Sequence, residues 1–392
     1  MRRLAGIGFL LLAAFAPSLA AQQRWRAFTT ELDSLAKADG VVGWSAVLVE
    51  DGKITARDDQ GMADRERHQP VEQGTVFHYG SITKTLTAIA ILQLAEQKLI
   101  GLDDPIVQYV PELTQVHDPY GSMDSVTIRM LLSHASGFQN PTFPWRRYED
   151  WEPFEPVEWS QLTGMMPYMS LRFRPGSRYG YSNPGYVFLA RVIERVTGDP
   201  WEGYIHKNIF QPLGLSESSF RHSPWSLAGR RSGNYTIVRD SASGRDAAVA
   251  NPREFDPGIT VPNSGWNAPL SDLARYAGVL AAVARGDTAW SRKLLPTAAL
   301  RSMWEPKYRI TGDEYNAGAD NWMGMGFFIY HRGGSTIVGH TGYQAGFRSL
   351  LFLNPTTGHA VIAVLNTDNG ADAASSGARL HRIEEAALRA VE

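Results

Sequence analysis

The sequence predicts an α/β protein in which an antiparallel sheet, flanked by helices, carries a mostly helical insertion. Strand-like runs and amphipathic helical patterns occur near both ends of the chain, whereas residues 106–261 are rich in Pro, Gly and aromatic side chains. The 392 residues are 43% hydrophobic and 20% charged, which is enough for a large core. We therefore expect residues 21–105 and 262–392 to form one α/β sandwich domain beside the inserted segment.

The first 20 residues have the pattern of a signal peptide. Two arginines precede an apolar run from Leu4 to Phe15, and small residues follow, with Ser18 and Ala20 in an A-x-A-like arrangement. A membrane anchor is the alternative, but the run is shorter than the roughly 20 residues that a span needs. We expect a periplasmic or secreted protein, cleaved near Ala20 and not stably inserted in a membrane.

Hydrophobic periodicity next predicts a helix and a hairpin. The apolar stripe of the helix, which ends at Gly40, consists of Trp25, Phe28, Leu32 and Leu35. Two strand-like runs follow, joined by Asp51 and Gly52, which is a strong hairpin signal. An almost wholly apolar helix is expected to begin near Ser81.

The C-terminal part supplies the remaining strands and a last helix. Residues 325–367 contain three or four strand-like runs separated by turns rich in Gly or containing Pro. A final helix from about Ala373 to Val391 presents Leu380, Ile383 and Ala387 on one face. Helix and strand patterns at both ends favour a single sheet assembled from both.

Composition excludes several classes of partner and chemistry. With 38 basic and 40 acidic residues and no long basic run, nothing suggests a nucleic-acid surface, so the expected partner is a small-molecule or peptide substrate. The sequence has no cysteine and no HExxH, and therefore we expect no metal and no cofactor. The GxSxG motif of α/β-hydrolases is also absent.

Ser81 and Lys84 form the first candidate catalytic pair. Three positions apart on a helix, their side chains lie on the same face, and a serine needs an adjacent base to act as a nucleophile. At the reference pKa of about 10.4 only roughly one lysine in 2,500 is neutral at pH 7, so Lys84 must be desolvated or crowded by cations to serve as a base. The alternative is a lysine whose charged head reaches solvent. The second SxxK copy, Ser34 and Lys37, reads as a solvated helix face.

Tyr181 and Asn183 form the second candidate group. They are two residues apart in an extended stretch and so point the same way, just before a helix that Pro184 opens and Gly198 closes. The structural alternative is that Asn183 caps the helix and Tyr181 belongs to the core. Beside Lys84 the tyrosine could instead share a proton with the amine.

His340, Thr341 and Gly342 form the third group, at the end of a predicted strand. A histidine at a strand end is usually structural, but Gly342 could let a substrate backbone lie along the strand edge. At the reference pKa of about 6.5, His340 would be about a quarter protonated at pH 7 and would recognise a carboxylate only in part.

Together these motifs resemble the serine β-lactamase and penicillin-binding protein superfamily, whose signature is SxxK, SDN and KTG. Here the set reads SITK, YSN and HTG in the same order, and the resemblance spans about residues 40 to 370. The tyrosine form resembles class C β-lactamases, D-Ala-D-Ala carboxypeptidases and related esterases. Further similar segments are LLSHASGF from Leu131, FRPGSRYGYSN from Phe173 and PLGL from Pro212. The resemblance implies a β-lactamase/transpeptidase-like fold.

The resemblance also implies residue roles. Ser81 would be the acylated nucleophile and Lys84 its proton partner. Tyr181 would relay protons and activate water, and Asn183 would bind the acyl side of the substrate. The backbone N–H groups of Ser81 and Tyr343 would form the oxyanion hole.

These roles predict an exported serine hydrolase that works through an acyl-enzyme. A D-amino peptide is the first expected substrate, as for a carboxypeptidase, and an ester is the second. His340 in place of lysine fits the carboxypeptidase and esterase branches better than a dedicated β-lactamase. A class C β-lactamase and a penicillin-binding sensor without turnover remain alternatives, and the sequence leaves the oligomeric state open.

Overall fold

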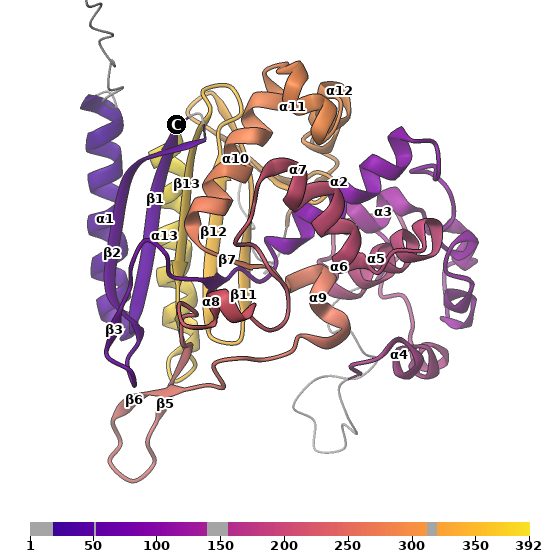
Figure 1. The fold of residues 1–392 in the computed structure, drawn as a ribbon. Helices are drawn as coiled ribbons and strands as arrows, with labels where there is room; N and C mark the ends of the chain where they lie inside the picture. Colours follow the sequence, from indigo (N-terminus) through magenta and orange to yellow (C-terminus); the bar gives the residue numbers. More distant parts are fainter. Residues whose placement is uncertain (1–18, 51, 139–155, 312–319) are drawn as a thin grey trace, which may run out of the picture.

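The computed structural model describes residues 19–50, 52–138, 156–311 and 320–392 (Figure 1). The predicted signal peptide lies outside these ranges, except for Leu19 and Ala20, which begin helix α1 (Leu19–Asp39). Within the described ranges, no helix combines the length and the apolar character that a membrane span requires.

A nine-stranded antiparallel sheet forms the centre of the molecule, in the order β3-β2-β1-β13-β12-β11-β10-β9-β8. Strands from the two ends of the chain meet in it, because β1 pairs with β13 and Trp44 lies opposite Leu365. The predicted antiparallel sheet is therefore confirmed. The strands are β1 (Gly43–Glu50), β2 (Lys53–Asp64), β3 (Gln69–Pro70), β8 (Tyr308–Arg309), β9 (Asn321–Met323), β10 (Phe328–Arg332), β11 (Ser335–Gln344), β12 (Phe347–Leu353) and β13 (His359–Leu365).

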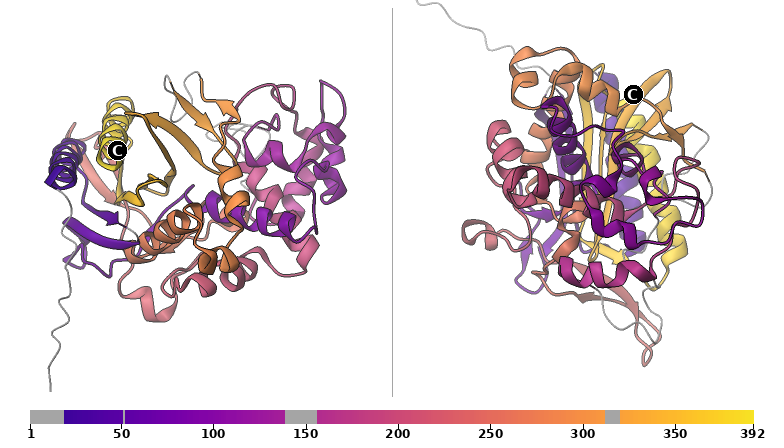
Figure 2. Two further views of the ribbon diagram at one scale, coloured as in Figure 1. Left: turned by 90° about the horizontal axis from the view of Figure 1, so that it is seen from above. Right: turned by 90° about the vertical axis from the view of Figure 1, so that its right-hand side faces the viewer.

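Helices cover both faces of this sheet (Figure 2). Helices α1 and α13 (Ala373–Val391) pack side by side on one face, and α10 (Leu270–Ala284) lies on the other. Strand β1 shows why two layers form: Ala46 and Leu48 point into the core under α1 and α13, whereas Val47 and Val49 point into the larger core on the α10 side. Alternate side chains of one strand thus bury against different helices.

The larger core continues into a mostly helical region beside the sheet (Figure 1). Its buried centre is α2 (Thr83–Glu96), which packs against α5 (Asn183–Thr197) and α9 (Val261–Ser264). The other helices are α3 (Ile128–Leu132), α4 (Trp159–Met165), α6 (Trp201–Ile205), α7 (Gln211–Leu213), α8 (Trp225–Ala228), α11 (Thr288–Lys293) and α12 (Thr297–Met303).

Two small sheets complete the fold. Strand β14 (Thr367–Asn369) pairs with β5 (Tyr235–Arg239), which pairs with β6 (Asp246–Ala250), and β4 (Phe77–His78) pairs with β7 (Asn267–Ala268). The β5–β6 hairpin lies in the stretch that the sequence predicted to be mostly helical or irregular. Its outer residues are exposed, so no strong hydrophobic alternation marks it.

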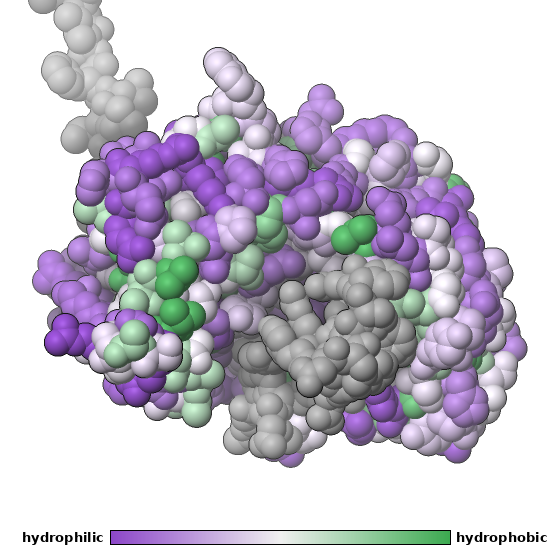
Figure 3. Space-filling view, turned by 90° about the horizontal axis from the view of Figure 1, so that it is seen from below, coloured by the Kyte–Doolittle hydropathy of each residue, from purple (hydrophilic) through white to green (hydrophobic). Residues whose placement is uncertain are grey.

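The local predictions at both ends agree with the structure. All four residues of the predicted α1 stripe are buried, and Gly40 follows the helix with φ +71°. Glu50 pairs with Lys53 across the predicted hairpin turn, where Gly52 has φ +77° and Asp51 lies outside the described residues. On the outer face shown in Figure 3, hydrophilic side chains predominate and hydrophobic ones form small, separate patches.

Candidate active site

Ser81 lies in the tight turn that leads into α2. The Lys84 N–H donates to the Ser81 carbonyl at 3.0 Å, an i to i+3 bond, so the regular helix begins two residues later than predicted. Lys84 Nζ lies 2.9 Å from Ser81 Oγ, and the two side chains share one face as their spacing requires. The second copy is different, because Ser34 is exposed and Lys37 pairs with Asp33 at 2.6 Å.

Lys84 is fully buried and surrounded by neutral groups. Besides Ser81, its Nζ contacts Asn183 Oδ1 at 2.8 Å and the Asn263 carbonyl at 3.0 Å, so three neutral oxygens surround the amine. Burial lowers the pKa of Lys84 well below its usual value, since no carboxylate within the described ranges contacts the amine to offset the loss of solvation. The alternative of a lysine head reaching solvent is wrong.

Asn183 is the first residue of α5, and the cap of that helix is its neighbour. The Ser182 side chain accepts the Gly185 N–H at 3.1 Å and so caps the helix. Our structural alternative, in which Asn183 caps the helix, is therefore wrong. Its side chain lines the cavity beside Lys84 instead.

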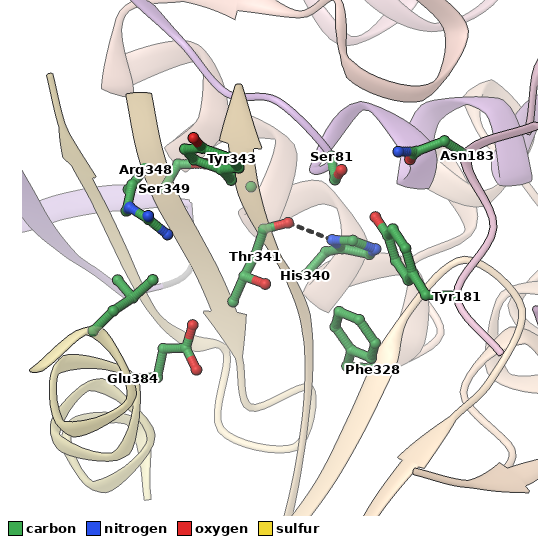
Figure 4. Close-up of a pocket in the computed structure, with 12 residues that line it drawn as sticks. Ser81, Tyr181, Asn183, Phe328, His340, Thr341, Tyr343, Arg348, Ser349 and Glu384 are labelled. Atoms are coloured by element: carbon green, nitrogen blue, oxygen red, sulfur yellow. Dashed lines mark hydrogen bonds between the residues drawn. The ribbon is translucent and has the colours of Figure 1, made fainter. Parts of the chain in front are cut away.

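Tyr181 lies between the lysine and the third motif. Lys84 Nζ is 4.9 Å from the centre of the Tyr181 ring, and the phenol oxygen points toward Ser81 in Figure 4. The side chain is only 7% exposed and also belongs to the core under α1 and α13. Tyr181 thus belongs to the core and also lines the cavity.

The ring of His134 packs against the ring of Tyr181, a contact that the sequence did not predict. His134 is a fully buried residue with φ +53°, its ring lies 4.4 Å from that of Tyr181, and its Nδ1 accepts the Ser182 N–H at 3.1 Å. Burial, and to a smaller extent the charge of Lys84, lower the pKa of His134 well below its usual value. The only sequence signal was its place in LLSHASGF.

Strand β11 carries the third motif along the opposite wall. Residues up to Gly339 pair with β10, whereas the following residues of β11 pair only with β12. Gly342 is needed for close packing, because a Cβ there would overlap the Tyr79 carbonyl oxygen. The sequence assigned this glycine to substrate approach, and the structure gives it a packing role that does not depend on substrate.

Tyr343 brings a backbone N–H close to the nucleophile. Gly80, the residue before Ser81, has φ +51°, and a Cβ on it would lie 2.9 Å from the Tyr343 nitrogen. Ser349 Oγ donates to the Tyr79 carbonyl at 2.9 Å and fixes this approach. The two backbones predicted to form the oxyanion hole therefore lie against each other.

His340 is buried and neutral. Its Nδ1 lies 2.5 Å from the Thr341 carbonyl, to which it donates, and its ring centre lies 4.5 Å from that of Phe328. Burial, with a smaller effect from the charge of Lys84, lowers the pKa of His340 to about 3. The expectation of partial charge at pH 7 is therefore wrong, because the reference value assumes a solvated ring.

A cavity of about 150 Å³ joins these elements. It brings together every predicted site residue except Lys84, which lies beneath Ser81. The lining residues are Ser81, Tyr181, Asn183, Phe328, His340, Thr341, Gly342, Tyr343, Arg348, Ser349, Leu380 and Glu384 (Figure 4). The sequence prediction missed the last two, from α13, and Phe328, Arg348 and Ser349, because only tertiary packing brings them here.

No group of three or more His, Cys, Asp or Glu side chains that could hold a metal ion occurs among the residues described by the structure. The arrangement itself offers a nucleophile with a desolvated amine, a phenol, and backbone N–H groups nearby. These are the parts that acyl transfer through a serine ester requires.

A family profile and several known proteins match this chain. A family profile described as Beta-lactamase matches residues 28–385. Esterase EstB of Burkholderia gladioli is 31% identical over 188 residues, which is 46% of this chain and 47% of that protein. Protein flp of Staphylococcus aureus is 22% identical over 330 residues, which is 84% of this chain and 60% of that protein. The chain thus spans about half to three fifths of these curated relatives.

Solved structures agree in fold. The octameric penicillin-binding protein homologue from Pyrococcus abyssi has a TM-score of 0.71 at 26% identity, covering 88% of this chain and 73% of that one. EstCE1, a hydrolase with promiscuous acyltransferase activity, has a TM-score of 0.72 at 20% identity, with coverage of 94% and 100%. A class C β-lactamase has a TM-score of 0.71 at 18% identity, covering 96% of this chain and 98% of that one. The fold is β-lactamase/transpeptidase-like, and with the profile match over residues 28–385 the chain belongs to the β-lactamase family.

Proposed function

We propose that this hydrolase forms an acyl-enzyme on Ser81 and acts on esters or D-amino amides whose leaving group bears no carboxylate. The observation that carries the proposal is the contact of Ser81 with a fully buried lysine whose three polar partners are neutral. A lowered pKa makes the neutral, basic form of the lysine more accessible, as nucleophile activation requires.

In the proposed acylation, neutral Lys84 accepts the hydroxyl proton of Ser81 while Oγ bonds to the substrate carbonyl carbon. The carbonyl oxygen becomes an anion against the backbone N–H groups of Ser81 and Tyr343. The bond to the leaving group then breaks, and Tyr181 gives the leaving atom a proton that Lys84 replaces. Deacylation runs in reverse, with water in place of the leaving group and Tyr181 accepting its proton.

The proposed choice of substrate follows from the charge of the cavity. A carboxylate beside the scissile bond needs a cation, but His340 is neutral there and Arg348 is already paired with Asp368. This disfavours β-lactams and the D-Ala-D-Ala peptides that the sequence placed first. The names of two similar proteins, an esterase and a D-stereospecific amidohydrolase from Streptomyces (25% identical, TM-score 0.68), support the remaining classes. We also propose export, directed by residues 1–20.

The test is a panel of four substrates given to the purified protein: p-nitrophenyl acetate, a D-amino-acid amide, a D-Ala-D-Ala peptide and nitrocefin. We expect the highest kcat/KM for the ester or the amide, with a transient acyl adduct on Ser81 in intact-mass spectra. Fastest turnover of nitrocefin would indicate a β-lactamase. Stoichiometric acylation by penicillin without turnover of any substrate would indicate a sensor.

A further inference from the structure

Glu384 is an acidic side chain at the far end of the same cavity. It projects from α13, and in Figure 4 its carboxylate points toward the strand that carries Thr341. The side chain is only 14% exposed. Among the described residues it forms no hydrogen bond, and its one ion-pair contact is with His381, at 4.0 Å. His381 is 56% exposed, and this distance is too long for a hydrogen bond. Glu384 is thus a largely buried carboxyl without a strong partner.

The other charged lining residue is already neutralised. Arg348 Nε donates to Asp368 Oδ1 at 2.9 Å, and its guanidinium lies 4.3 Å from the centre of the Tyr343 ring. The Tyr343 hydroxyl donates to the second oxygen of Asp368 at 2.8 Å. Because Arg348 is held by Asp368 and His340 is neutral, any charge that Glu384 carries gives the cavity a net negative charge.

We propose that Glu384 binds a positively charged group of the substrate, so that the enzyme prefers esters or amides carrying an ammonium group. This inference rests on the proposed function of the Ser81 site and specifies its substrate class. An ammonium in the cavity would supply the partner that Glu384 lacks in the free protein, and a carboxylate there would meet like charge.

The surroundings of Glu384 make this preference depend on pH. Burial raises its pKa to about 8, with Arg348 from β12 opposing the rise and Glu385 of the same helix adding to it. Tyr330 from β10 faces it as a neutral phenol, since burial raises the pKa of Tyr330 well above the usual value. On the α1 side, Glu31 pairs with arginines of α13 and is thereby neutralised.

The pH dependence of kcat/KM reports the ionisation of groups in the free enzyme. The value of kcat/KM should therefore change over the pH range in which Glu384 loses its proton. Above about pH 8 Glu384 is anionic, and below that value it is neutral. The kcat/KM ratio of a cationic substrate to its neutral twin should therefore rise between pH 6.5 and 9. This rise should be absent in a variant that cannot ionise.

The experiment compares Glu384→Gln with Glu385→Gln. Glu385 is the adjacent glutamate of α13 and does not line the cavity, but pairs with Arg332 at 3.0 Å. Two substrate pairs differ only in charge: p-nitrophenyl ε-aminocaproate with p-nitrophenyl heptanoate, and acetylcholine with its neutral carbon isostere. The first pair places the cation on the acyl side, and the second places it on the leaving group.

We expect Glu384→Gln to lower the cationic-to-neutral ratio at pH 8.5 by about tenfold in at least one pair, and Glu385→Gln to leave it within about twofold. A second measurement is independent of turnover: titration of hexylammonium chloride into the Ser81→Ala protein, with and without each glutamine substitution. Unchanged ratios in both pairs together with unchanged hexylammonium affinity in Glu384→Gln would overturn the inference. Absence of any Ser81-dependent hydrolysis would overturn the proposed function instead, and the titration would then decide the role of Glu384.

Discussion

The chain contains the same four-residue motif, SxxK, twice, once within helix α1 and once in the turn that leads into α2. In α1, Ser34 is exposed, and Lys37 has a side chain that is 75% exposed and pairs with Asp33. In α2, Lys84 is fully buried and contacts Ser81 at 2.9 Å, and the partners of its amine among the described residues are neutral. Spacing is therefore common to both copies, and burial distinguishes them.

This difference shows what converts a lysine into a base. The amine of Lys37, at the surface, keeps its hydration and pairs with the Asp33 carboxylate. In the interior the Lys84 amine loses hydration, and loss of the proton becomes easier. The neutral oxygens around Lys84 hold the amine in place without restoring the charge that would stabilise the ammonium.

The largest difference between the copies is expected from the two serines. Ser81→Ala removes the nucleophile and should lower kcat/KM for p-nitrophenyl acetate by at least about a thousandfold. Ser34→Ala should change it by less than about twofold. Labelling by a fluorescent phosphonate should be lost in the first variant only, and labelling that survives Ser81→Ala would place the nucleophile elsewhere.

The two lysines give the next effect. Lys84→Ala should slow acylation by about a hundredfold or more, because general base catalysis contributes about 10² to 10⁴. Lys37→Ala should leave the rate unchanged. Single-turnover kinetics measure acylation directly. Equal rates in the two variants would show that burial of Lys84 serves packing and not catalysis.

Tyr181 extends the comparison, since α1 has no tyrosine beside its lysine. Tyr181→Phe keeps the ring that packs on His134 but removes the hydroxyl, and should slow acylation or deacylation by more than about tenfold. Tyr168→Phe, at a side chain that is 73% exposed, is the control. Wild-type burst and steady-state rates in Tyr181→Phe would make the tyrosine purely structural.

Much of the fold could be predicted because strong local patterns carry it. The α1 stripe, the hairpin at Gly52 and the helix Ala373–Val391 all have clear periodicity or turn residues. The β5–β6 hairpin was missed because its mostly exposed side chains leave no such pattern. The start of α2 was misplaced by two residues, because the sequence pattern of a tight i to i+3 turn resembles that of a helix.

The site was predictable where its chemistry lies in short motifs and was not where packing assembles it. Ser81, Tyr181 and His340 were found from the residues around them. His134 and Glu384 were not, because a buried imidazole behind a tyrosine and a helix glutamate facing a cavity have no local signature. The neutral state of His340 was missed for a related reason: a reference pKa contains no information about burial.

The smallest expected effect is on stability, and it tests the cause of the difference between the two lysines. The pKa of Lys84 is lower in the folded protein than in the unfolded chain, where it is near 10.4. Between these two values the unfolded chain binds more protons, so this term raises the free energy of unfolding as pH rises. Lys84→Met removes the term. The stability advantage of Lys84→Met over wild type should therefore shrink from pH 7 to 9, by at most about 1.4 kcal/mol per pH unit.

Urea denaturation of the two proteins at several pH values measures this difference, and titrating groups that do not interact with Lys84 cancel in the subtraction. Lys37→Met provides the matched control, since an exposed lysine keeps its solvent on folding and the difference from wild type should stay flat. A flat difference for Lys84→Met as well would mean that the buried amine holds its proton in the folded protein as firmly as in the unfolded chain. Desolvation would then not explain the proposed difference in reactivity between Ser81 with Lys84 and Ser34 with Lys37.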